Sequence, residues 1–70
     1  MDIKELEVRF NYHPPTPGQI EKYGELRNRF LELAKHLTET CPESRELSSV
    51  ITHLEQTLMW ANAAIARRSK

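Results

Sequence analysis

The run from Leu58 to Ala66 is the part of this sequence that most constrains the fold. Apolar residues recur every three or four positions along the preceding segment, which predicts a helix over about residues 42–68. Its N-terminal half has one apolar face, but from Leu58 onward every side is apolar except at Asn62. A helix that is apolar all round is buried all round, and one partner helix cannot cover it. We therefore expect several copies of this chain to assemble.

The size and composition of the chain support the same expectation. A chain of 70 residues buries only about 60% of the surface exposed by its unfolded form, and its single cysteine, Cys41, cannot form an intramolecular disulfide. Ten Lys and Arg balance ten Asp and Glu, which argues against polymeric nucleic acid as a partner. The N-terminus lacks the pattern of a signal peptide, and no apolar run approaches the roughly 18 residues of a membrane span. We expect one intracellular domain, residues 1–70, that does not enter a membrane.

A second helix is predicted over about residues 17–40. Thr16 is placed as its N-cap, Pro17 occupies the first helical position, and Gln19 completes a capping box. Pro42 then ends this helix and is predicted to open the next, with Thr40 or Cys41 as the N-cap. The fold class is therefore all-α: a two-helix antiparallel hairpin that oligomerises into a helical bundle.

The segment 1–15 is predicted as an N-terminal arm or a short helix. Ile3, Leu6 and Phe10 have helical spacing, whereas Val8, Phe10 and Tyr12 alternate as in a strand, and the segment is too short for periodicity to decide. The three prolines at positions 14, 15 and 17 stop regular structure, so the segment should end extended and stiff.

Three residues break the helical pattern. Arg27 falls within the apolar stripe of helix 17–40, where it could extend to solvent, pair with Glu55 or another acid, or bind an anionic ligand between subunits. Tyr12 could cap the core or stack on a planar group. Asn62 could fix the register of an oligomer or recognise the polar edge of a ligand.

No catalytic or metal-binding pattern is present in the sequence. His13, His36 and His53 fall on different predicted segments, and neither paired cysteines nor an HExxH motif occurs. Cys41 is more simply a small core or cap residue than a nucleophile. We therefore predict no catalytic residues, no metal and no cofactor.

Taken together, several motifs resemble the phage anti-CBASS cyclic-nucleotide sponge family over about residues 8–68. The run from Met59 to Arg67 is the most specific of them, and the others are Phe10-Asn11-Tyr12-His13-Pro14-Pro15, Gly18-Gln19, Tyr23, Leu26-Arg27, Cys41-Pro42-Glu43-Ser44-Arg45-Glu46 and Leu54-Glu55. The resemblance implies a non-enzymatic protein that sequesters cyclic di- and trinucleotides in the cytoplasm of an infected bacterium. It also implies a homo-oligomer, a hexamer built from interlocked dimers.

The resemblance also implies roles for particular residues. Tyr12 would stack on a base, Arg27 would pair with a phosphate, and Arg67 would belong to a trinucleotide pocket on a three-fold axis. With the residues that flank Tyr12, the predicted ligand-binding set is Tyr12, Arg27, Asn11, His13 and Arg67. Three alternatives stay open: a sponge for the cyclic ADP-ribose isomers of Thoeris defence, a helical module that binds only protein, and, weakest, a phosphodiesterase.

Overall fold

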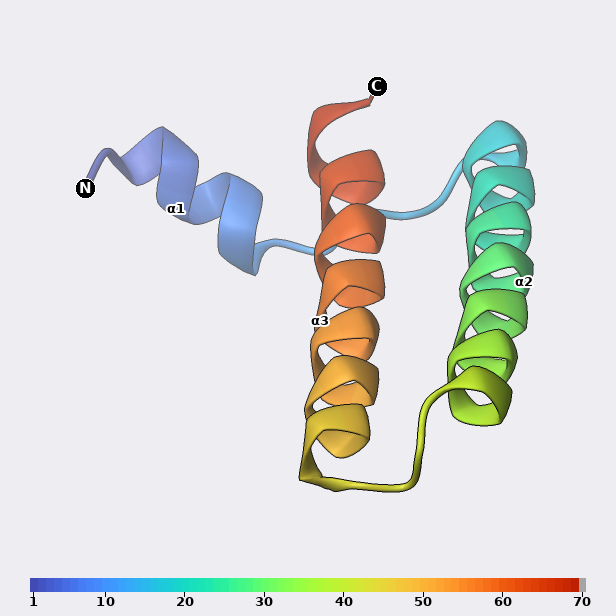
Figure 1. Ribbon diagram of the computed structural model, residues 1–70. Coiled ribbons are helices and arrows are strands. Elements are labelled where there is room, and N and C mark those ends of the chain that lie inside the picture. Colours follow the sequence, from blue (N-terminus) through green and yellow to red (C-terminus); the bar gives the residue numbers. More distant parts are fainter. Residues whose placement is uncertain (70) are drawn as a thin grey trace.

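The computed structural model describes residues 1–69, which form three α-helices and no strand (Figure 1). The helices are α1 (Ile3–Phe10), α2 (Pro17–Thr40) and α3 (Arg45–Arg68). The all-α fold class is therefore confirmed, and α2 and α3 form the antiparallel hairpin that the sequence predicts. Within the described residues, no helix combines the length and apolarity needed to cross a membrane.

The N-terminal segment adopts the helical alternative and not the strand. The Asp2 side chain caps α1 by accepting a hydrogen bond from the backbone N–H of Lys4. The helix ends at Phe10, where Asn11 is already extended. Residues 11–16 then form an extended arm with no regular structure, which leads into α2.

The start of α2 follows the predicted capping box. The Thr16 hydroxyl accepts from the Gln19 backbone N–H at 3.2 Å, and the Gln19 side-chain oxygen accepts from the Thr16 backbone N–H at 3.1 Å. Pro17 occupies the first turn, where its missing N–H leaves no hydrogen bond unmade. Side-chain contacts within one turn therefore define this helix start.

The start of α3 differs from the prediction. The helix begins at Arg45 and not at Pro42, and its N-cap is Ser44, not Thr40 or Cys41. The extended backbone of Ser44 lets its hydroxyl accept from the Leu47 N–H at 3.1 Å. Pro42 instead lies in the connection that reverses the chain direction between the two long helices.

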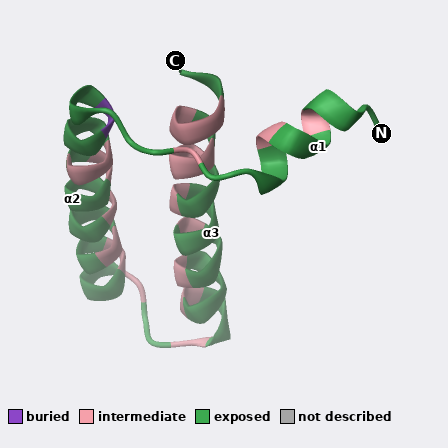
Figure 2. Ribbon diagram, turned by 180° about the vertical axis from the view of Figure 1, so that it is seen from behind, coloured by how far each residue is buried: buried purple, intermediate pink, exposed green. Residues whose placement is uncertain are grey.

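The fold is a plate one helix layer thick. Its extents are 45 × 30 × 13 Å, and its radius of gyration is 15.3 Å, against about 11 Å for a compact domain of this length. The chain exposes 5881 Å², roughly 1,300 Å² more than expected for a compact monomer of its mass. No apolar side chain among the described residues is buried (Figure 2). A stable domain packs two layers, and a single copy supplies one.

Candidate ligand-binding grooves

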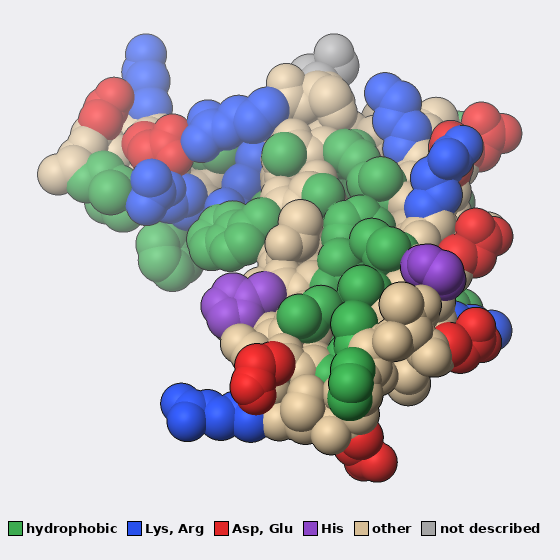
Figure 3. Space-filling model, in the orientation of Figure 1, with side chains coloured by type: hydrophobic (Ala, Val, Ile, Leu, Met, Phe, Trp, Pro, Cys, Tyr) green, Lys and Arg blue, Asp and Glu red, His purple; other side chains and the backbone are tan. Residues whose placement is uncertain are grey.

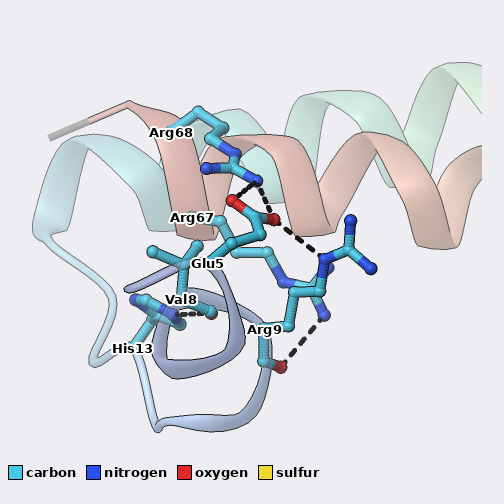
Figure 4. Close-up of polar contacts among 6 residues, drawn as sticks. All are labelled: Glu5, Val8, Arg9, His13, Arg67 and Arg68. Carbon is cyan, nitrogen blue, oxygen red and sulfur yellow. Dashed lines mark hydrogen bonds and ion pairs between the residues drawn. The ribbon is translucent and has the colours of Figure 1, made fainter. Parts of the chain in front are cut away.

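Helix α1 is tied to the C-terminal end of α3 by charged groups (Figure 4). Arg68 donates from Nη2 to both carboxylate oxygens of Glu5, at 2.7 and 3.0 Å. Arg9 reaches the same carboxylate at 2.8 Å, and Nη2 of Arg67 lies 3.4 Å from the backbone oxygen of Arg9. These contacts set the position of α1 beside α3.

The Glu5 carboxylate is electrostatically stabilised in its charged form. Hydrogen bonds from Arg68, and next from Arg9, lower the pKa of Glu5 from 4.5 to about 2. The same hydrogen bond to Glu5 raises the pKa of Arg68. At neutral pH the end of α3 therefore carries a permanent cluster of charges.

Beside this cluster lies a hollow of about 470 Å³, which we call the α1–α3 groove; it is lined by Arg9, Phe10, Trp60, Ala63, Ala64, Arg67 and Arg68. Figure 3 shows large hydrophobic side chains beside basic ones where α1 meets α3. Phe10 is 82% exposed and Trp60 is 70% exposed. Open aromatic faces beside guanidinium groups can bind a planar group that carries negative charge.

The α1–α3 groove contains one predicted ligand residue, Arg67. Sequence reasoning missed Phe10, Trp60 and Arg9 as its neighbours. Trp60 stands in the apolar run, whose pattern predicts that it is buried, and no local signal pairs it with Phe10 on another helix. A smaller hollow adjoins the α1–α3 groove at Trp60 and extends toward Gln56 and Met59.

A second groove, of about 320 Å³, runs between α2 and α3; this hairpin groove is lined by Arg27, Phe30, Leu31, Ala34, Ile51, Leu54, Glu55 and Leu58. Arg27 is exposed, and its Nη2 lies 3.8 Å from the position that a Cβ on Gly24 would occupy. Within residues 1–69 it forms no hydrogen bond or ion pair, so the intramolecular pair with Glu55 considered above is not formed.

The arm presents the other three predicted residues. Figures 1 and 2 show it crossing one broad face of α3 on its way to α2. Tyr12 is 82% exposed and lines neither groove, and Asn11 is also exposed. His13 is half-buried, with Nε2 at 2.6 Å from the backbone oxygen of Val8, so its ring ties the arm to α1.

One chain thus brings the predicted residues to three places: Arg67 in the α1–α3 groove, Arg27 in the hairpin groove, and Asn11, Tyr12 and His13 on the arm. Asn62 is half-buried, and its Oδ1 is buried without a hydrogen-bond partner among residues 1–69. No group of three or more His, Cys, Asp or Glu side chains in that range could hold a metal ion.

Comparison with known families gives one match. The family model described as Acb2/Tad1, hairpin domain, matches residues 1–66. Neither the search of curated proteins nor the search of solved structures found a match.

Proposed function

The chain belongs to the Acb2/Tad1 hairpin-domain family, which is the family of anti-CBASS and anti-Thoeris sponges, and from this membership we propose that it is a phage anti-defence sponge. It binds cyclic di- and trinucleotide second messengers of CBASS immunity and withholds them from host effectors without cleaving them. It acts in the cytoplasm of the infected bacterium as a homo-oligomer, a hexamer built from dimers.

The observation that carries this proposal is the groove in which open aromatic side chains adjoin arginines. A cyclic oligonucleotide offers flat bases and singly charged phosphates, and both have complementary groups on this chain. Phe10 and Trp60 supply aromatic surface beside Arg67 in the α1–α3 groove. We further propose that two joined copies bring Tyr12, which is exposed on the arm, beside Arg27 of the hairpin groove as a second such combination.

The symmetry of the ligand supports a site shared between subunits. A cyclic dinucleotide has near two-fold symmetry, and a two-fold dimer offers one Tyr12 and one Arg27 to each half. Two stacks of about 1–3 kcal/mol each and two charge-assisted contacts of about 1.5–3 kcal/mol each sum to roughly 5–12 kcal/mol. Nanomolar capture requires about 12 kcal/mol, so Asn11, His13 or closure of the arms must add to these contacts.

The proposal is tested by isothermal titration of the purified chain with a panel of cyclic di- and trinucleotides, combined with native mass spectrometry. We expect saturable binding at a fixed ratio of ligand to oligomer. After denaturation, chromatography of the released ligand should return it intact. A linear product would show catalysis, and absence of heat with every compound would favour a module that binds only protein.

A second candidate function rests on the same family match, because that family also includes anti-Thoeris sponges. In this case the ligand is a cyclic ADP-ribose isomer, which also combines a base with phosphates. Competition between the two ligand classes separates the candidates. Displacement of a bound cyclic dinucleotide by the ADP-ribose isomer would indicate a shared pocket.

A further inference from the structure

The hairpin groove contains two charged residues on an apolar floor. Arg27 comes from α2 and Glu55 from α3, and the other residues that line the groove are aliphatic or aromatic. Neither Arg27 nor Glu55 has a hydrogen bond or ion pair within residues 1–69. Both are exposed, and each stands beside apolar surface that a single chain leaves uncovered.

The groove lies on a plate that exposes enough area for a second copy. The chain exposes roughly 1,300 Å² more than a compact monomer of its mass, and a standard interface buries about 800 Å² on each partner. Leu31 in this groove is 53% exposed, and Ile20 on the same helix is 57% exposed. A second plate of the same kind would supply the missing layer.

The two unpaired charges decide how two such plates pack. If the two-fold axis runs along the helices, α2 of one copy covers α3 of the other, and all neighbouring helices are antiparallel, as in an up-and-down four-helix bundle. Arg27 of each copy then faces Glu55 of the other. If the axis runs across the helices, α2 covers α2 and like charges approach, which is unfavourable.

We propose that the hairpin groove is a self-complementary interface in which Glu55 of each copy is the counter-ion for Arg27 of the other. The inference rests on the proposed function only in that both require assembled copies. In this interface Glu55 of one copy neutralises the Arg27 guanidinium of the other, whose Nη2 in a single copy lies 3.8 Å from the position that a Cβ on Gly24 would occupy.

A charge-swap experiment on the full chain tests this pairing. Arg27→Glu and Glu55→Arg should each weaken self-association at least about tenfold in sedimentation velocity, because each places like charges together twice. The double variant exchanges the two charges and should return association to within about threefold of the unmodified chain. Arg29→Glu is the matched control, since Arg29 is 73% exposed and pairs with Glu25 on its own helix; it should associate normally.

Several outcomes would overturn the pairing. If both single variants self-associate normally, Arg27 and Glu55 do not meet across the interface. If the double variant self-associates more weakly than either single variant, each of the two residues interacts with some other group. Circular dichroism identifies any variant that fails to fold. In that case Arg27→Gln and Glu55→Gln replace it, and a double-mutant cycle with no coupling between them rejects the pair.

The two proposals fail in different ways. Titration of the unmodified chain with a cyclic dinucleotide tests the function without reference to Glu55. If the unmodified chain binds the dinucleotide but the double variant does not regain self-association, the pairing is rejected and the proposed function stands. Rescue without any binding supports the interface and rejects the sponge.

Discussion

Replacement of Gln19 tests how the start of α2 is joined to the C-terminal end of α3. Gln19 is the one buried residue among those described, with 7% exposure. Its Nε2 donates to the backbone oxygens of Ile65 at 3.2 Å and Ser69 at 2.6 Å, and its Oε1 accepts from the Thr16 N–H at 3.1 Å. One amide therefore caps α2 and also satisfies carbonyls at the end of α3.

The expected effect follows from these three hydrogen bonds. At about 1 kcal/mol each, Gln19→Ala should lower the free energy of unfolding by about 3 kcal/mol. For a domain of this length, this loss corresponds to a fall in Tm of roughly 12–24 °C. Thermal unfolding followed by circular dichroism measures it. All variants are compared at one protein concentration, because self-association raises Tm.

Two further variants separate the cap from the cross-link. Thr16→Ala removes only the cap hydroxyl and should cost about 1 kcal/mol. Gln19→Glu keeps an acceptor for the Thr16 N–H but loses the donor, and its carboxylate faces the oxygens of Ile65 and Ser69; a loss of about 2 kcal/mol or more is expected. If Gln19→Glu unfolds with the Tm of the unmodified chain, the link between α2 and α3 contributes nothing and the reasoning is refuted.

Further predictions concern the grooves and the charged cluster. Tyr12→Ala should weaken cyclic dinucleotide binding at least about tenfold in titration while the oligomer persists; unchanged affinity removes the stacking role. Arg67→Ala should weaken trinucleotide binding alone, and an equal loss with dinucleotides would contradict a separate pocket. Because the pKa of Glu5 is lowered to about 2, its link to Arg68 should stabilise the position of α1 above about pH 4.5 and be lost as the pH falls through about 2. NMR shifts of α1 amides measure this, and Arg68→Gln should move the transition to higher pH, because Arg9 alone then lowers the pKa of Glu5. Gly24→Ala should raise the Tm of a single copy, since a Cβ there meets Arg27 at an ordinary 3.8 Å and alanine favours helix by about 1 kcal/mol; weaker ligand binding in this variant would place the ligand or partner against that backbone.

The fold could be predicted from the sequence where neighbouring residues decide it. Thr16, Pro17 and Gln19 define the start of α2 by contacts within one turn, and the structure begins that helix at Pro17. The start of α3 was predicted three residues early because both Pro42 and Ser44 suit a helix N-terminus. The chain must also reverse direction there, which local preference does not encode.

The candidate site was less predictable, because its parts come from distant segments. Arg67 could be proposed from a motif, but its aromatic neighbours could not. Phe10 belongs to a segment whose periodicity does not decide between helix and strand. Trp60 stands in an apolar run, and the pattern of that run predicts a place in the core. In the structure both side chains are open to solvent and line one groove. The ion pair between Glu5 and Arg68 and the hydrogen bond from Arg67 to the backbone oxygen of Arg9 hold these helices together, and sequence spacing gives no sign of either contact.

The two grooves are relevant to the number of chains that the assembly contains. The hairpin groove and the α1–α3 groove share no lining residue, and both contain apolar side chains that a single chain leaves exposed. A two-fold contact buries the same patch on each partner, so a contact confined to the hairpin groove would not cover Phe10 and Trp60. Those residues need either a ligand or a different contact between dimers. A closed assembly of dimers, such as the proposed hexamer, would supply a contact of this kind.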